Sequence, residues 1–449
     1  MKPTLIQGNI KQGILLFAIP LFLSNFFQQL YNTVDTLLIG HFLGDAPLAA
    51  LGATAAIFEL IVQFCSGMSL GFGIVISRYY GAKDTDKLKI AIAESLIFGF
   101  FIALFLSIVS CSIMPWLLRI LKTPNAIYSM AYSYIHVIAA TLIITMFYNL
   151  AACLFRSIGN SLTPLYVLII TSIVNVILDT IFITQWHIGI RGAAFATVLS
   201  QVLAALLCFG IIYKKEPLLV PKRNHFKMDA DIVHELLSQG FAMGFMFSIV
   251  SIGTIILQSG INPLGTNIIA AHTAARKWFA LLVLPLSTLG ATTSTFVSQN
   301  RGAKQWDRME QGIRFCIHFD WLYTIVLTVI VFLFAQPMIH ILSGSANDIV
   351  LANGTRYLQI NIPGFIVLGP LLTYRNALQG NGYKIYPLIS SGIELAGKIV
   401  FTIWVIPALA YFGVILCEPV IWTLMSIQLW ISYRIIKTEN TWKRANQFD

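Results

Sequence analysis

Long apolar runs alternate with short polar joints along the whole chain. An α-helix needs about 20 consecutive apolar residues to cross the hydrocarbon core of a membrane. Dividing the chain at its charged and Pro/Gly-rich clusters predicts twelve such runs, with approximate limits at 13–42, 48–79, 90–116, 127–155, 164–184, 191–213, 236–261, 268–298, 311–335, 350–379, 387–408 and 412–434. The pattern therefore predicts an all-α polytopic membrane protein with twelve transmembrane helices.

The composition supports this class. Of the residues, 57% are hydrophobic and 11% are charged, whereas a soluble globular domain is typically about 45–50% apolar and about 25% charged. This excess of apolar side chains excludes a soluble enzyme, a disordered scaffold and a secreted disulfide domain. The six cysteines lie singly in apolar stretches without a CxxC pair, so we expect small buried side chains rather than metal ligands.

The two halves of the chain echo each other. Residues 77–83 (SRYYGAK) match residues 298–304 (SQNRGAK) with an offset of 221, and the Gly-to-Pro part of 155–164 matches that of 374–387 with an offset of 223. Parallel repeats of this kind are typical of transporters. We therefore predict three parts, namely an N-terminal six-helix lobe at 1–213, a cytoplasmic linker at 214–235 and a C-terminal six-helix lobe at 236–449.

The basic residues favour the loops on one side. If the N terminus is inside, the tails and the loops after even-numbered spans hold 22 of the 29 Lys and Arg residues, and the opposite loops hold four. Because cytoplasmic loops carry the excess of Lys and Arg, both termini are predicted to be cytoplasmic, in the inner or plasma membrane of the cell. The net charge of +10 is explained in the same way, and we expect no nucleic acid partner.

Ionisable residues inside the predicted spans are functional candidates, because each is costly to place in a membrane. Asp35 lies in the first span, and Tyr31 lies one turn earlier. Asn175 and Asp179 are four residues apart in the fifth span and face the same way, while Thr197 begins the sixth. Carboxylate, amide and hydroxyl oxygens can replace water around Na⁺, and two close carboxylates repel each other until one takes up a proton. We predict a cation-coupling site here. The alternative is that Asp179 caps a helix kink and Asp35 lines a water-filled cleft.

The repeat offset predicts different chemistry in the second half. By this offset, Lys398 is equivalent to Asn175 and Glu418 is equivalent to Thr197. Glu394 lies one turn before Lys398. An ammonium group held among carboxylates does the job of a bound cation permanently. We therefore interpret this second-lobe charge cluster as a neutralised relic of the first-lobe site, with a simple intrahelical ion pair as the alternative.

Further polar residues in the spans are candidates for substrate binding: Tyr31, Asn149, Gln258 and Arg276. Arg276 is adjacent to Lys277, so the two face different directions. For both, an ion pair with Glu59, Asp320 or Glu418 on a neighbouring helix is the alternative to substrate contact. Pro20 removes one backbone hydrogen bond from the first span and predicts a kink before Asp35.

Several of these segments together resemble the multidrug and toxic compound extrusion (MATE) family, in particular its prokaryotic DinF-like branch. They are 34–36 (VDT), 155–159 (FRSIG), 175–179 (NVILD), 192–197 (GAAFAT) and 374–380 (YRNALQG). The resemblance covers essentially the whole chain. It implies a V-shaped pair of six-helix bundles that alternates its central cleft between the two faces. It also implies export of organic cations and amphipathic drugs in exchange for Na⁺ or H⁺.

For individual residues, the resemblance implies a cation site made of Asp35, Asn175, Asp179 and Thr197, with Asn149 as a polar partner. It also assigns helix bending to Pro20. A second branch of the family has an acidic residue in the seventh span, but residues 241–258 contain none here. This difference agrees with the absence of a second coupling site in the repeat comparison.

These observations predict a multidrug antiporter driven by H⁺ or Na⁺, with no cofactor except Na⁺ in the second case. The alternative is a flippase for lipid-linked oligosaccharides or lipids in the same superfamily. A receptor or scaffold would not need buried acidic pairs, and no nucleotide loop, metal set or Ser-His arrangement predicts an enzyme. We expect a monomer surrounded by membrane lipid, with a small cationic or amphipathic molecule as its substrate.

Overall fold

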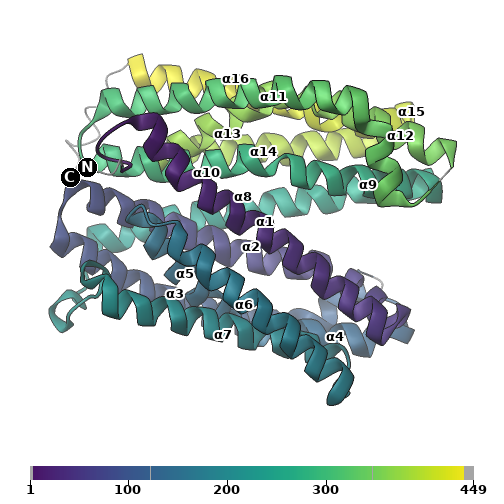
Figure 1. Cartoon of the computed structure of the whole chain (residues 1–449), viewed down its shortest axis with the longest axis horizontal. Coiled ribbons are helices and arrows are strands. Elements are labelled where there is room, and N and C mark those ends of the chain that lie inside the picture. Colours follow the sequence, from purple (N-terminus) through teal and green to yellow (C-terminus); the bar gives the residue numbers. More distant parts are fainter. Residues whose placement is uncertain (1–3, 122, 346, 439–449) are drawn as a thin grey trace. The chain divides into compact units, whose positions relative to one another are not determined.

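The computed structural model of the chain describes residues 4–121, 123–345 and 347–438. Throughout these ranges the regular structure is helical (Figure 1). Apolar segments form helices in a hydrocarbon environment because every backbone N–H and C=O group is then bonded within the segment. The prediction of an all-α membrane protein is confirmed.

The helices of the first half are α1 (Ile10–Leu43), α2 (Asp45–Ala82), α3 (Thr85–Ile120), α4 (Asn125–Ala140), α5 (Leu142–Ser157), α6 (Leu162–Thr180) and α7 (Ile190–Lys215). Those of the second half are α8 (Ala230–Ile261), α9 (Thr266–Leu282), α10 (Leu284–Gly302), α11 (Trp306–Ser343), α12 (Asp348–Asn361), α13 (Phe365–Gly380), α14 (Ile385–Val400), α15 (Ile406–Leu409) and α16 (Tyr411–Thr438). Two π-helical turns follow α6 and α14, at Ile181–Gln185 and Phe401–Val405.

Nine helices in the described ranges are long and apolar enough to cross a membrane. Two helix pairs, α4 with α5 bent by 51° and α9 with α10 bent by 41°, pass the same test only together, and the number is eleven if each pair is one span. The predicted run at 350–379 corresponds to α12 and α13, which are separated at 362–364 and have 14 and 16 residues. The hydrophobic pattern located this region but did not predict its breaks.

Contacts divide the chain into two compact units. Ile19–Ser248 forms the N-terminal unit, and Met1–Ala18 with Ile249–Asp449 forms the C-terminal unit. The boundaries fall inside α1 and α8, so each of these helices begins in one unit and ends in the other. The lobe limits at 1–213 and 236–449 and the linker at 214–235 stay predictions.

Backbone geometry supports the internal repeat. Residues with positive φ recur at equivalent places in the two halves: Gly44 and Gly265, Lys83 and Lys304, Gly159 and Gly382, and Gly189 and Ala410. The second pair lies in the sequence echo of 77–83 and 298–304. The two π-helical turns also follow corresponding helices. The two halves therefore share their turns as well as their short motifs.

Small residues allow the helices of the N-terminal unit to pack closely. α2 packs against α3, α4 and α5, around a core that includes Met68, Phe72 and Leu150. A side chain on Gly73 would overlap the Cys153 sulfur of α5. In the space that the glycine leaves, the Ser157 hydroxyl donates a hydrogen bond to the Gly73 carbonyl at 3.0 Å. Close backbone approach at small residues is a common basis of helix packing in membranes.

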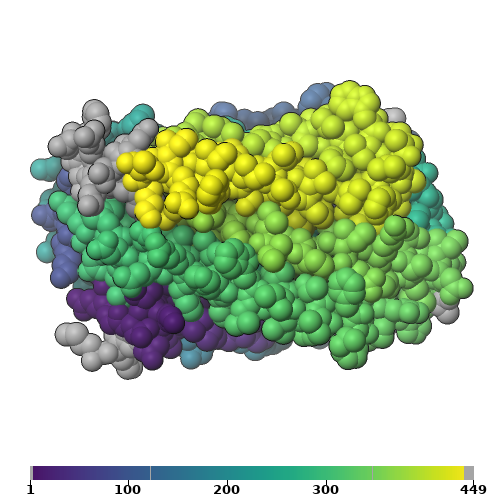
Figure 2. Space-filling model, turned by 90° about the horizontal axis from the view of Figure 1, so that it is seen from above, coloured from purple at the N-terminus to yellow at the C-terminus, as the bar shows by residue number. Residues whose placement is uncertain are grey.

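The start of the chain is fixed to the C-terminal unit. Arg308 at the beginning of α11 donates hydrogen bonds to the carbonyls of Thr4, Leu5 and Gly8, and Asn300 donates to the Leu5 carbonyl. Figure 2 shows these first residues in purple against the green start of α11. Farther along α11, a row of exposed large apolar side chains is suited to lipid, namely Leu322, Ile325, Val326, Val329, Ile330, Phe332 and Leu333.

The contact at Gly73 predicts a destabilising substitution. Gly73→Ala adds a methyl group where no space exists, so we expect the unfolding free energy to fall by about 1–3 kcal/mol. Gly52→Ala is the matched control, because Gly52 is in the same helix with open space around it. There the better helix propensity of alanine should stabilise by up to about 1 kcal/mol. Thermal unfolding in detergent measures both, and equal effects would contradict the packing described here.

Candidate functional site

Two carboxyl groups meet inside the N-terminal unit. Asp35 of α1 is half-buried, Asp179 of α6 is completely buried, and their side chains are hydrogen-bonded to each other. An ionised carboxylate only accepts hydrogen bonds, so this contact requires a proton on one of the two groups. The other oxygen of each carboxyl, Oδ1, is buried without a hydrogen-bond partner in the described part of the chain.

Asn175 connects this pair to α7. In the amide orientation that satisfies both of its polar atoms, Asn175 donates to Asp179 Oδ2 at 2.8 Å and accepts from the Thr197 backbone N–H at 3.2 Å. The Tyr31 hydroxyl donates to Thr197 Oγ1 at 3.3 Å. The structure therefore brings together all four residues predicted to couple to a cation, with Tyr31 beside them.

The local backbone positions these groups. The spacing of four residues puts Asn175 and Asp179 on one face of α6. Directly after Asp179, the helix passes into the π-helical turn Ile181–Gln185. Such turns change the helical register and are frequent at functional sites.

A small cavity of about 40 Å³ lies beside the hydrogen bond between Tyr31 and Thr197. Tyr31 and Thr197 belong to its wall, which is completed by Gln28, Tyr148, Leu168, Thr171, Ser172, Ser200, Gln201 and Ala204. One water occupies roughly 30 Å³ of liquid volume. The enclosed space is thus on the scale of water or a small ion.

Gln201 in this wall was not predicted from the sequence. Thr145 donates to Gln201 Oε1 at 2.7 Å, and Gln201 lies one turn after Thr197 on the same face of α7. That spacing was the signal that could have found it. Asn149, predicted as a substrate residue, instead donates to the Thr145 carbonyl of its own helix at 2.9 Å and is not among the wall residues.

Pro20 lies in α1 two residues after the boundary between the units. The helix is continuous from Ile10 to Leu43 across it. The Pro20 carbonyl accepts a hydrogen bond from the Ser24 hydroxyl at 2.9 Å. The bending role of Pro20 stays a prediction.

A larger pocket, of about 330 Å³, lies in the C-terminal unit. It is lined by Thr254, Leu257, Gln258, Ile261, His272, Thr273, Arg276, Lys277, Ala280 and Glu418. The predicted substrate residues Gln258 and Arg276 are therefore together here. The Gln258 amide of α8 donates to Oδ1 of Asn262, the first residue after that helix, at 2.8 Å.

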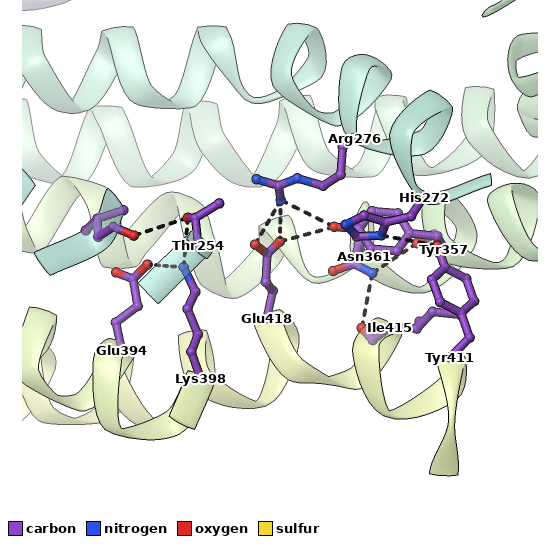
Figure 3. Close-up of polar contacts among 11 residues, drawn as sticks. Thr254, His272, Arg276, Tyr357, Asn361, Glu394, Lys398, Tyr411, Ile415 and Glu418 are labelled. Atoms are coloured by element: carbon purple, nitrogen blue, oxygen red, sulfur yellow. Dashed lines mark hydrogen bonds and ion pairs between the residues drawn. The ribbon is translucent and has the colours of Figure 1, made fainter. Parts of the chain in front are cut away.

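Arg276 pairs with an acid on another helix. Its Nη1 is 2.8 and 3.0 Å from the two carboxylate oxygens of Glu418 on α16, and Tyr357 of α12 also donates to Glu418 at 3.3 Å (Figure 3). Of the two predictions for Arg276, the ion pair across helices is the one seen. The attraction between the two charges and the hydrogen bond from Tyr357 offset part of the cost of removing them from water.

The predicted cluster of Glu394, Lys398 and Glu418 consists of two separate pairs. Lys398 is buried in α14. Its Nζ donates to Glu394 Oε1, one turn earlier, at 2.8 Å, and to Thr254 Oγ1 of α8 at 3.5 Å (Figure 3). Glu418 is occupied by Arg276 instead. The intrahelical ion pair, predicted as the alternative, is therefore present.

A metal site has no support in the described residues. No group of three or more His, Cys, Asp and Glu side chains converges there as a metal site. The sites of this part of the chain are thus a carboxyl pair in one unit and a pocket with paired charges in the other.

Comparison with known proteins agrees with these features. The MatE family model matches residues 20–181 and 242–404. The "Probable multidrug resistance protein YoeA" of Bacillus subtilis (strain 168) is 26% identical over 405 residues, which cover 89% of this chain and 85% of that protein. The "Probable multidrug resistance protein NorM" of Thermotoga maritima is 24% identical over 86% of this chain and 83% of that protein.

The fold is also shared with solved structures. The crystal structure of MATE in the bent conformation superposes with a TM-score of 0.90 at 22% identity, covering 98% of both chains. The two segments that the family model matches carry the carboxyl pair in the first half and the Glu394–Lys398 pair in the second. The chain therefore belongs to the MatE family, the multidrug and toxic compound extrusion transporters, and it is a multi-pass membrane transporter rather than an enzyme.

Proposed function

We propose that the protein exports small cationic or amphipathic molecules, including drugs, by alternating access, in exchange for H⁺. The observation that carries this proposal is the hydrogen-bonded pair of the half-buried Asp35 and the buried Asp179. The cargo class is supported by the names of relatives such as YoeA and NorM, each of which is called a "Probable multidrug resistance protein".

The geometry favours a proton over Na⁺. A hard cation needs several oxygen ligands at once. In the N-terminal unit, however, the Asn175 oxygen accepts from a backbone N–H and the Thr197 hydroxyl accepts from Tyr31. The Oδ1 atoms of the two carboxyl groups are the remaining unpartnered oxygens of the predicted site. A proton needs no more than these two groups.

A change in the charge of the Asp35–Asp179 pair accounts for the exchange of cargo for a proton. With one shared proton the pair carries one negative charge, which attracts a cationic cargo. A second proton neutralises the pair and removes that attraction. Cargo and proton then compete through charge, and the cargo does not have to enter the small cavity.

The helix that carries Asp35 can link the charge of the carboxyl pair to a conformational change. α1 starts in the C-terminal unit and passes Asp35 within the N-terminal unit. Pro20, which lacks a backbone N–H, weakens the helix near the point where the units meet along the chain. We therefore propose that protonation of the pair changes the bend of α1, and that this bend accompanies alternation between the two faces.

The first test is the removal of one carboxyl. Asp35→Asn keeps the shape but not the exchangeable proton, so uptake of ethidium into proteoliposomes driven by a pH gradient should fall to background. Asp320→Asn is the matched control, because Asp320 is also buried within a span but accepts from Thr373 at 2.9 Å in the other unit. Transport at the wild-type rate in Asp35→Asn would contradict the proposal. Failure of folded wild-type protein under both pH and Na⁺ gradients would favour the lipid flippase.

A second substitution distinguishes the two ions. Thr197→Val removes a hydroxyl oxygen that a Na⁺ site needs, but it leaves both carboxyl groups in place. We expect transport driven by a pH gradient to remain within about twofold of wild type, because the proton is held by the carboxyl pair. Transport driven by a Na⁺ gradient in wild type, and lost in Thr197→Val, would instead establish Na⁺ as the coupling ion.

We also propose that both termini face the cytoplasm, as the distribution of Lys and Arg indicates. Green fluorescent protein fused at either end should fluoresce, because it matures inside the cell. Alkaline phosphatase fused at the same places should be inactive, because it needs export to fold. The reverse pattern at either end would overturn this orientation.

A further inference from the structure

The pocket of the C-terminal unit differs in charge from the carboxyl site of the N-terminal unit. Among its ten lining residues, Arg276 and Lys277 are cationic and Glu418 is the one acid. Its volume of about 330 Å³ lies in the range of sites for small molecules, which is about 300–1,000 Å³. Apolar side chains from Leu257, Ile261 and Ala280 line it as well. The pocket is therefore amphipathic, with an excess of positive charge.

The acid in this pocket is already used. Glu418 contacts Arg276 through both carboxylate oxygens and accepts a further hydrogen bond from Tyr357 (Figure 3). The neighbouring pair of Glu394 and Lys398 is also closed, at 2.8 Å. These contacts leave no carboxylate of the pocket wall available to a cationic ligand.

Lys277 is the cation without a counter-charge. It follows Arg276 in α9, its side chain is exposed, and it forms no ion pair or hydrogen bond with the residues that the structure describes. α9 and α10 together qualify as one broken membrane span. An ammonium group within a span is costly unless it pairs with another group or reaches water. The side chain is thus available to a ligand in the pocket.

We propose that this pocket binds an acidic group, a carboxylate or a phosphate, attached to an apolar body. Lys277 supplies the opposite charge, and the hydroxyls of Thr254 and Thr273 and the amide of Gln258 lie in the same wall as hydrogen-bond donors. Leu257 and Ile261 contact the apolar part. The acid can belong to a soluble amphipathic molecule or to an anionic lipid headgroup. This site is separate from the proposed proton site and does not depend on it.

Equilibrium binding tests the proposal directly. The probe is 11-(dansylamino)undecanoic acid, a fluorescent carboxylate with an apolar chain, and its methyl ester is the uncharged comparison. We expect the purified full-length protein in neutral detergent to bind the acid roughly tenfold more tightly than the ester, as for one charge pair of about 1.4 kcal/mol. Lys277→Gln should abolish that preference. Equal affinities of wild type for acid and ester would overturn the proposal.

Two variants control for folding and net charge. Lys11→Gln removes one exposed positive charge from the same unit, outside the pocket, and should keep the tenfold preference. Glu418→Gln frees Arg276 and should tighten binding of the acid, with a thermal unfolding curve to confirm that the variant is folded. Loss of the preference in Lys11→Gln as well, or weaker binding in folded Glu418→Gln, would show that Lys277 and the pocket are not the site.

Competition identifies the source of the acidic group. Phosphatidylglycerol in nanodiscs should displace the probe if the ligand is a lipid headgroup, and phosphatidylcholine is its zwitterionic control. Displacement by sodium decanoate in phosphatidylcholine nanodiscs supports a soluble amphipathic acid. Failure of both anions to displace the probe from wild type would overturn binding at this pocket. Asp35→Asn should bind the probe like wild type, so a failure of proton coupling and a failure of this site are distinguishable.

Discussion

The energetic cost of a charge in an apolar environment determines how this molecule is organised. Most buried charges of the C-terminal unit are satisfied within it: Arg276 by Glu418 and Lys398 by Glu394. Among the described residues, the carboxyl pair of α1 and α6 and the Lys277 ammonium lack full compensation, and the buried carboxyl groups of Glu94 and Asp320 each keep one oxygen without a hydrogen-bond partner. Both functional roles that we propose are placed at groups whose electrostatic compensation is incomplete.

The two halves of the internal repeat have similar backbone turns but different side chains at equivalent positions. Positive φ values recur at Lys83 and Lys304, and a π-helical turn follows both α6 and α14. These turns fix the positions of the helix ends. Side chains at equivalent places are then free to change, so that Asn175 in one half corresponds to Lys398 in the other. One scaffold thus presents a protonatable acid in one unit and an excess of positive charge in the other.

Much of this was predictable from the sequence, for physical reasons. The spans follow from continuous apolar runs, and the convergence of Asn175 and Asp179 follows from a spacing of four residues in a helix. The six cysteines are unpaired as expected, and five are buried. The break at 141 was not predictable, because it does not interrupt the apolar pattern strongly. The break at 362–364 contains Pro363 and Gly364, a helix-breaking pair that the division into apolar runs did not use. The partner of Glu418 was not decided either, because it depends on how α9 packs against α12 and α16, and hydrophobic periodicity carries no such information.

The pair of Asp35 and Asp179 takes up and releases one proton, the second, in each cycle of the exchange that we propose, and this has a consequence for its energetics. One proton returned for one monovalent cation moves no net charge across the bilayer, so the cycle is electroneutral. The membrane potential then does no work on it, and the pH difference alone limits how far a cargo can be concentrated, by about tenfold per pH unit. A transporter with this stoichiometry works best in a cell that acidifies its surroundings, and it becomes idle when the two sides reach the same pH, however large the voltage between them.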